Sequence, residues 1–199
     1  MFTGIIQGLG KIIAIDRHAT DLSLRIETPN NFLTNVQIGD SIACNGVCLT
    51  AVAIAGAAFY ADVSGESLEK TTIGEWQTNT VLNLEKALTA QQPLGGHIVS
   101  GHVDGVGIIR ARQIDGRSER FSIQAPKLLA KYIAAKGSIT IDGTSLTVNS
   151  VNGDEFSVNI VPHTLEHTII GAYQPGTQVN LEVDVIARYL ERLLEARES

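Results

Sequence analysis

The sequence predicts an all-β protein made of two tandem, homologous antiparallel barrels followed by one C-terminal amphipathic α-helix. Three observations predict this fold class. The chain repeats itself at a constant shift, and its apolar residues form short runs rich in Val, Ile and Thr between turn residues. Helical spacing of apolar residues is confined to the last stretch, from Asp184 onwards.

The composition is that of a folded protein and argues against a nucleic-acid-binding function. Of its 199 residues 44% are hydrophobic and 18% are charged, which is enough apolar surface for a core and too little charge for disorder. The net charge of −6 and the lack of any Lys/Arg cluster argue against nucleic-acid binding. The sequence begins without a signal-peptide pattern, and two cysteines make no disulfide framework, so we expect a cytoplasmic protein.

An internal repeat sets the domain organisation. A shift of 97 residues places Gly46 on Gly143 and aligns four blocks without a gap. The aligned blocks are Ser41–Thr50 with Ser138–Thr147; Gly4, Gly8 and Gly10 with Gly101, Gly105 and Gly107; Leu68, Glu69 and Gly74 with Leu165, Glu166 and Gly171; and Asn83–Glu85 with Asn180–Glu182. Four blocks in one register predict two copies of one folding unit.

Each copy is predicted to be a barrel of six or seven short strands, because a unit this small avoids exposed strand edges best by closing on itself. The Gly- and Pro-containing polar stretch 91–96 marks the boundary between the copies. This places an N-terminal barrel at residues 1–92, a C-terminal barrel at residues 97–184 and a helix at residues 185–199.

The uncharged stretch 41–61 is long enough to suggest a membrane span, but two features favour strands. Asn45-Gly46 between apolar runs is a strong hairpin signal, because both residues tolerate positive φ. The matching stretch of the second copy contains polar residues that a lipid-spanning helix would not tolerate, namely Asp142, Asn149, Asn152 and Asp154. We therefore predict buried strands here and no membrane contact.

The stretch after Asp184 carries an apolar stripe at helical spacing, with charged residues between its members. The stripe consists of Val185, Ile186, Tyr189, Leu190, Leu193 and Leu194. It has no counterpart in the first copy. On this pattern alone, packing against its own barrel and forming an oligomer stem are about equally supported.

Two motifs suggest ligand sites but fit them poorly. Residues 101–107 carry three glycines in strand-rich sequence, and these recur in the first copy, so turns or bulges explain them better than a dinucleotide fingerprint. Residues 163–167 read His-Thr-Leu-Glu-His and match a zinc-peptidase pattern, but the equivalent residues 66–70 contain no histidine. We predict no metal site there, nor at His97 or His102.

The two cysteines flank the predicted turn. In a two-residue hairpin Cys44 opposes Val47, so Cys48 points to the other face and no disulfide between the cysteines is expected. A buried, unreactive thiol is the default expectation for each. Cys48, however, occupies the position of Ser145, so two equivalent sites each carry a small polar side chain before Leu-Thr. This pattern predicts two pockets for two like ligands.

Six motifs in one order are specific enough to indicate a family. They are residues 1–8 (MFTGIIQG), 45–50 (NGVCLT), 95–103 (GGHIVSGHV), 142–148 (DGTSLTV), 162–166 (PHTLE) and 180–184 (NLEVD). With them the chain closely resembles riboflavin synthase of the alpha-chain type over nearly its whole length. The resemblance implies two six-stranded Greek-key barrels and a homotrimer in which the C-terminal helices form a stem.

The resemblance also implies an activity, the last step of riboflavin biosynthesis. Two molecules of 6,7-dimethyl-8-ribityllumazine would dismutate by transfer of a four-carbon unit to riboflavin and 5-amino-6-(D-ribitylamino)uracil. No cofactor or metal is implied, because C7 of the substrate ring is open to addition and its methyl group is acidic. Each active site would hold two substrates, between the N-terminal barrel of one subunit and the C-terminal barrel of its neighbour. Association with lumazine synthase, which makes the substrate, stays an open question.

Substrate-binding residues follow from the same resemblance. The first site would be lined by Gly4, Ile5, Ile6, Cys48, Leu49, Thr50, Asp62, Val63, Ser64, Gly65, Glu66 and Ser67. The second would be lined by Gly101, His102, Val103, Lys136, Ser145, Leu146, Thr147, Ile160, Val161, Pro162, His163, Thr164 and Leu165. Main-chain groups would pair with the amide-like edge of the ring, and hydroxyls with the ribityl chain.

Six side chains are candidates for the chemistry, namely His102, Ser145, Thr147, Cys48, Asp142 and Asp184. Histidine titrates near neutral pH, so His102 is the expected proton shuttle. The two hydroxyls, oriented by one of the aspartates, would deliver an oxygen nucleophile to C7 or activate water there. The cysteine would contact the ring in the first site or add to it.

The main alternative is a relative of the same fold without catalysis, an antenna protein that binds a lumazine or flavin chromophore. Such a protein would be expected to lose the polar residues of the second site, whereas His102 and residues 142–147 keep them. A zinc hydrolase built on His163 and His167 is the weaker alternative.

Overall fold

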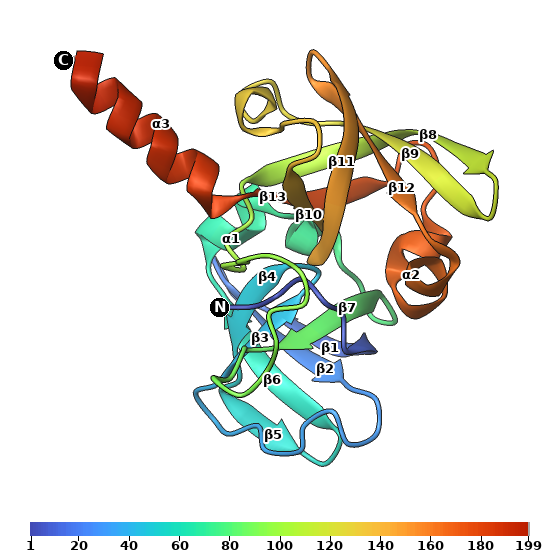
Figure 1. Ribbon diagram of the computed structural model, residues 1–199. Helices are drawn as coiled ribbons and strands as arrows, with labels where there is room; N and C mark the ends of the chain where they lie inside the picture. Colours follow the sequence, from blue (N-terminus) through green and yellow to red (C-terminus); the bar gives the residue numbers. More distant parts are fainter. Residues whose placement is uncertain (199) are drawn as a thin grey trace.

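The computed structural model describes residues 1–198 as two β units and a projecting helix (Figure 1). The first unit contains β1 (Gly8–Arg17), β2 (Leu22–Glu27), β3 (Ser41–Cys44), β4 (Val47–Thr50), β5 (Ala53–Ala55), β6 (Ala58–Val63), α1 (Gly65–Lys70), η1 (Thr72–Glu75) and β7 (Val81–Lys86). The second contains β8 (Gly105–Asp115), β9 (Ser118–Gln124), η2 (Ala130–Tyr132), β10 (Ser138–Ile141), β11 (Thr144–Asn152), β12 (Glu155–Ile160), α2 (Pro162–His167), η3 (Ile169–Ala172) and β13 (Gln178–Val183). The chain continues into α3 (Val185–Glu198).

The predicted fold class is confirmed, with one difference between the two units. The second unit is a closed barrel in the order β10-β11-β12-β9-β8-β13. The first is a curled seven-stranded sheet in the order β4-β3-β7-β1-β2-β6-β5. In the second unit β11 pairs with both β10 and β12 and passes a bulge between Val148 and Ser150. The equivalent stretch of the first unit is broken into β4 and β5, which leaves that sheet open.

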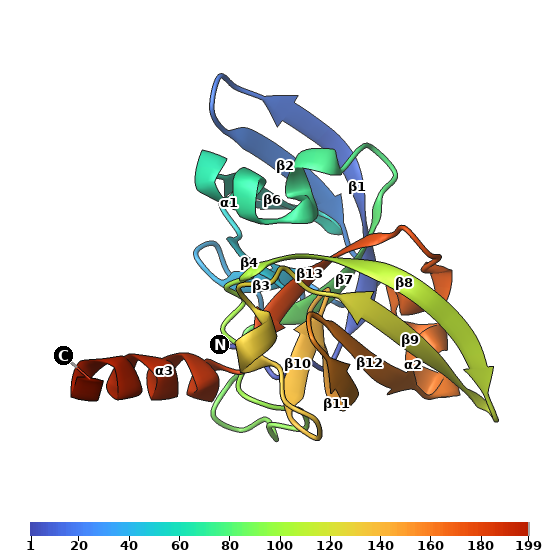
Figure 2. The same ribbon diagram turned by 90° about the horizontal axis from the view of Figure 1, so that it is seen from above.

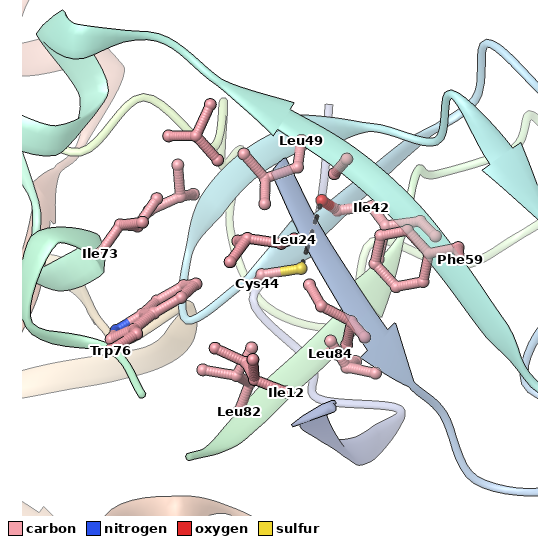
Figure 3. Packing of buried hydrophobic residues seen from close by; sticks show 14 of the residues in the cluster. Ile12, Leu24, Ile42, Cys44, Leu49, Phe59, Ile73, Trp76, Leu82 and Leu84 are labelled. Carbon is pink, nitrogen blue, oxygen red and sulfur yellow. Dashed lines mark hydrogen bonds between the residues drawn. The ribbon is translucent and has the colours of Figure 1, made fainter. Parts of the chain in front are cut away.

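The predicted hairpin at Asn45-Gly46 is present and sorts the two cysteines. Cys44 pairs with Val47 across the turn, and both Asn45 and Gly46 have positive φ. Cys44 is buried in the core of the first unit among residues such as Ile42 and Leu84 (Figure 3). Burial raises the pKa of its thiol, so this cysteine is unreactive, as predicted. Both cysteines are free.

The two units meet through their hairpin turns and through one asparagine of each last strand. Asn83 Nδ2 donates to the carbonyl of Asp142, and Asn180 Nδ2 donates to the carbonyl of Asn45, both at 2.9 Å. Each asparagine also accepts a main-chain N–H of the other unit. Each of these four bonds has its counterpart 97 residues away, which is the arrangement that a pseudo-twofold axis between the two units produces.

Helix α3 leaves the end of β13 and projects away from both units (Figure 2). The structure describes this helix over Val185–Glu198, and Ser199 lies outside the described residues. The apolar stripe does not pack on the barrel: its members Ile186, Tyr189, Leu190, Leu193 and Leu194 are each at least half exposed. No helix within residues 1–198 is long and apolar enough to cross a membrane.

Candidate functional site

In each unit, the segment before the first strand crosses to the hairpin of the other unit. Ser145 N donates to the carbonyl of Gly4 at 2.8 Å, and Cys48 N donates to the carbonyl of Gly101 at 2.9 Å. The contact is too close for side chains, since a Cβ on Gly4 would lie 2.5 Å from Ser145 Cβ and one on Gly101 would lie 2.7 Å from Cys48 Cβ. Both candidate sites are therefore built from both repeats.

This exchange corrects the expected grouping of the site residues. Sequence similarity places residues 4–6 with Cys48, but the structure places Gly4 against Ser145. Sequence similarity also places residues 101–103 with Ser145, but the structure brings these residues to Cys48. The reason is geometric, because a repeat alignment shows which residues are equivalent and not which barrel each segment touches.

Two buried glutamates hold the exchanged segments, and the sequence reasoning missed both. Glu85 accepts from Thr3 N at 2.7 Å, from Thr3 Oγ1 at 2.6 Å and from Gly4 N at 3.0 Å. Glu182 makes the equivalent three bonds to Ser100 and Gly101. Burial raises the pKa of Glu85, and the three donors oppose that rise. The sequence contains a signal for this role, because the internal repeat places a glutamate at the same position of β7 and β13, Glu85 and Glu182.

A cavity of about 220 Å³ lies beside Cys48, at the N-terminal unit. Its walls come from β4, α1 and the exchanged segment, with the lining residues Val47, Cys48, Glu66, Ser67, Lys70, Thr71, Gly101, His102 and Val103. Most of these were predicted to bind substrate, whereas Val47, Lys70 and Thr71 were not. Cys48 reaches this cavity because alternate residues of a strand face opposite sides, which sends Leu49 into the core.

The remaining residues predicted for the first site lie outside this cavity. Val63 is buried in the core like Leu49, and Thr50 is exposed at the end of β4. The Asp62 carboxylate accepts from Ser23 Oγ at 2.6 Å. Ser64 is the N-cap of α1 and Gly65 is its first residue, so these two position the helix whose later residues line the cavity. The side chains of Leu49 and Val63 pack in the core of the first unit, which leaves only the main-chain groups of these two residues for a ligand.

The second site is centred on Ser145, whose partner is His97. His97 Nδ1 lies 2.7 Å from Ser145 Oγ. Burial lowers the pKa of His97, although Asp184 and Glu182 nearby oppose the shift, so the neutral imidazole is favoured. The role of His97 was not predicted: from the sequence it is part of the motif at residues 95–103 and was considered only as a metal ligand. The approach of this segment to Ser145 requires a glycine at position 96, since a Cβ there would lie 2.1 Å from the carbonyl of Thr3 and 3.0 Å from Ser145 Oγ.

Other residues predicted for the second site lie at varied depth in the second unit. Thr147 is exposed two residues beyond Ser145 on β11, and Lys136 lies in the turn before β10, where it has a φ of 68°. The side chain of Ile160 is buried in the core of the second unit, with Leu146 and Leu165 packed against that core, which leaves only the main-chain groups of Ile160 for a ligand. Val161 is the N-cap of α2 and is exposed, as are Pro162 and His163 at the start of the helix, whereas Thr164 is half-buried.

The two aspartates do not orient Ser145, contrary to the prediction. Asp142 is buried between the units, where its carboxylate accepts from Asn180 N at 2.8 Å and from the Tyr173 hydroxyl. Asp184 accepts from Ile186 N at 3.0 Å and so begins α3. Both side-chain oxygens of Asp142 are already engaged by groups of its own unit, which leaves His97 as the group that binds the serine hydroxyl.

Replacing Asp142 with asparagine is expected to stabilise the protein increasingly as the pH rises. Burial raises the pKa of Asp142 from 3.8 to about 7. Between these values the unfolded chain is ionised and the folded chain is protonated, so wild-type stability falls as the pH rises through this range and stays low above it. Asparagine fits the turn, because Asn45 stands at the equivalent position with φ 44° against 43° for Asp142.

The measurement is the free energy of unfolding in urea at one protein concentration. We expect the difference between Asp142→Asn and wild type to grow by on the order of 2–4 kcal/mol from about pH 4.5 to about pH 8. A difference that stays constant over this range would contradict the assignment of a protonated Asp142.

The histidines of α2 do not form a metal centre with other residues. His163 and His167 stack with ring centroids 4.1 Å apart, and His167 Nδ1 lies 2.8 Å from the carbonyl of His163. Within residues 1–198, no three His, Cys, Asp or Glu side chains are grouped to hold a metal ion. The helix itself has only six residues, against the long helix that the zinc-peptidase motif requires.

Comparison with known proteins agrees with this geometry. The lumazine binding domain family matches residues 3–87 and 100–184. The riboflavin synthase of Photobacterium phosphoreum is 46% identical over 194 residues, covering 98% of this chain and 89% of that one. The riboflavin synthase of Brucella abortus (strain 2308) is 44% identical over 200 residues, covering 98% of both chains.

Solved structures show the same architecture. LumP complexed with 6,7-dimethyl-8-(1'-D-ribityl) lumazine has a TM-score of 0.83 at 27% identity, covering 92% of this chain and 99% of that one. LumP complexed with riboflavin has a TM-score of 0.84 at 29% identity, with the same coverage. Fold and paired sites thus define a protein of two tandem lumazine-binding domains. Within that class, the chain belongs to the riboflavin synthase family.

Proposed function

We propose that this protein catalyses the dismutation of two 6,7-dimethyl-8-ribityllumazine molecules to riboflavin and 5-amino-6-(D-ribitylamino)uracil. The observation that carries the proposal is the pair of equivalent sites, one at Cys48 and one at Ser145, built by the same exchange of segments. A reaction that consumes two identical molecules needs two similar binding sites. One substrate is the oxidant and the other the reductant, so no external redox cofactor takes part.

The Ser145–His97 pair is the proposed nucleophile of the second site. The neutral imidazole would take the hydroxyl proton as Ser145 Oγ adds to C7 of a bound lumazine, and it would return the proton when the oxygen leaves. The 2.7 Å separation of Oγ and Nδ1 and the lowered pKa of His97 both support this role. Thr147, on the same face of β11, would bind the ribityl chain.

In the first site, His102 is the proposed proton shuttle. It is exposed at the wall of the cavity beside Cys48, so it can exchange protons with both the acidic C7 methyl group and solvent. Cys48 would contact the ring. The cavity of about 220 Å³ is smaller than the roughly 300–1,000 Å³ of usual ligand pockets, which supports a site completed by another surface.

We propose that a neighbouring subunit supplies that surface within a homotrimer. The exposed stripe of α3 supports an assembly through this helix, because five large apolar side chains stay uncovered in the single chain. In the trimer, the N-terminal unit of one subunit would face the C-terminal unit of the next, so that the two bound lumazines lie face to face.

The double variant Leu190→Glu/Leu193→Glu is expected to dissociate into folded monomers, because it places two charges in the stripe. Sedimentation velocity would show the change in mass, and riboflavin formation would fall more than about 10-fold as the facing sites separate. Arg192→Glu, away from the stripe on the same helix, is the control and should stay trimeric. A wild-type protein that sediments as a monomer at full activity would contradict the assembly.

Incubation of the purified protein with 6,7-dimethyl-8-ribityllumazine alone tests the reaction. Riboflavin absorbance should appear at catalytic turnover, with one uracil product for each riboflavin. Tight binding without product would instead support the antenna function, and it would remove the chemistry from Ser145 and His97.

A further inference from the structure

Arg188 of α3 reaches back from the helix to the segment that precedes β8. Its Nη2 lies 2.6 Å from Asp104 Oδ1 and donates to the carbonyl of His102 at 2.9 Å. Both side chains are mostly shielded, with exposed fractions of 33% for Arg188 and 15% for Asp104. A charge-assisted bond in such surroundings is stronger than an ion pair in open water.

This segment forms one wall of the first cavity. Residues 101–103 line it beside Cys48, and Gly101 N is held by Glu182 Oε2 at 2.9 Å. Arg188 adds an attachment in the middle of the segment, because it binds the carbonyl of His102, the residue whose side chain lines the cavity. The direction of the His102 side chain therefore depends on main-chain bonds on both sides.

The internal repeat provides a natural comparison for the role of Asp104. Its equivalent in the first copy is Gln7, whose Oε1 accepts from Lys86 N at 3.1 Å. Asp104 Oδ2 makes the same bond to Val183 N at 2.8 Å. A neutral amide is thus sufficient for this bond at the strand end. What the carboxylate adds in the second copy is a charged oxygen for Arg188.

We propose that Arg188 is a positioning residue: by binding Asp104 and the carbonyl of His102, it fixes the His102 segment against the first cavity. The geometry of that cavity then depends on how α3 is seated, so assembly of the helices and order in the site are coupled. The inference rests on the proposed function, since it gives the arginine a part in turnover without contact with substrate.

Steady-state kinetics of three variants test the role in turnover. Arg188→Met removes the guanidinium and keeps an apolar stem, and we expect kcat to fall about 10-fold while KM stays within about twofold. Arg188→Lys keeps the charge and should recover most of kcat. Arg192→Met is the control: Arg192 is 80% exposed and pairs with Glu195 of the same helix at 3.7 Å, so its loss should change neither constant.

Hydrogen exchange in the full chain tests the positioning separately from the reaction. Arg188→Met should speed amide exchange in residues 101–104, and Arg192→Met should not. Asp104→Asn keeps an acceptor for Val183 N and should speed the same amides, which provides the test if Arg188→Met does not fold.

Unchanged exchange in these amides overturns the proposal, and so does faster exchange with an unchanged kcat. A loss of kcat that Arg192→Met shares would overturn it as well, because the effect would then belong to the helix as a whole. A wild-type chain that makes no riboflavin, but whose variants show faster exchange in this segment, would refute the proposed function and leave the positioning intact.

Discussion

Replacing Ser145 with alanine is expected to lower kcat for riboflavin formation by about 10²- to 10⁴-fold, the range of a lost nucleophile or proton-transfer group. The hydroxyl lies 2.7 Å from His97 Nδ1, and burial keeps that imidazole neutral and able to accept its proton. Removing the hydroxyl leaves the fold intact, because Ser145 N still donates to the carbonyl of Gly4. Stopped-flow absorbance of riboflavin measures the effect.

His97→Gln should cost a similar factor, and the double variant should be no slower than the slower single variant, because the two groups act as one unit. Ser150→Ala is the matched control on the same strand: its hydroxyl bonds Ser157 Oγ at 2.7 Å outside the site. It should leave kcat within about twofold of wild type. A Ser145→Ala protein that also stays within about threefold would show that the serine is not the nucleophile.

Replacing Gly46 with alanine is expected to destabilise the protein by more than about 3 kcal/mol, the largest effect on stability that we foresee. Gly46 has a φ of 78°, which costs a residue with a Cβ about 1–2 kcal/mol. The new Cβ would also lie 2.7 Å from Gly143 N, where the two turns meet. Because that atom belongs to a buried main chain, relief requires the two units to move apart.

Gly56→Ala separates the two costs. Gly56 has a similar φ of 62°, and no heavy atom lies within 4 Å of the Cβ that alanine would add. It should therefore lose only about 1 kcal/mol, measured by urea unfolding at the same protein concentration. Equal losses in the two variants would mean that backbone strain alone matters and that the units do not meet as tightly as described.

Local features of the fold followed from the sequence because their causes are local. The turn at Asn45-Gly46 needs two residues that tolerate positive φ, and the sequence offers them between apolar runs. Cys44 pairs with Val47 across this turn, and alternation along β4 then turns Cys48 to the opposite face, so Cys44 lies in the core and Cys48 at a cavity. The break between β4 and β5 could not be foreseen, because the aligned stretches are similar and only the second runs on as one strand.

The sequence indicated several residues of the candidate sites but not which of them contact one another. Cys48, Ser145 and His102 line or form the candidate sites, whereas Leu49, Val63 and Ile160 lie in the cores. The family resemblance covers whole motifs, so it predicts all of these residues as site residues alike. Side-chain direction within a strand decides which of them face a ligand.

What the sequence by itself determined is the duplication, the strand-rich units, the terminal helix and the family, since each of these is a pattern along the chain. Only the tertiary structure decided that Gly4 lies against Ser145, that His97 binds the serine hydroxyl, and that Arg188 holds the His102 segment. The reason is the duplication itself. Each segment of a repeated chain has two equivalent partners, and only packing across the pseudo-twofold axis selects one of them.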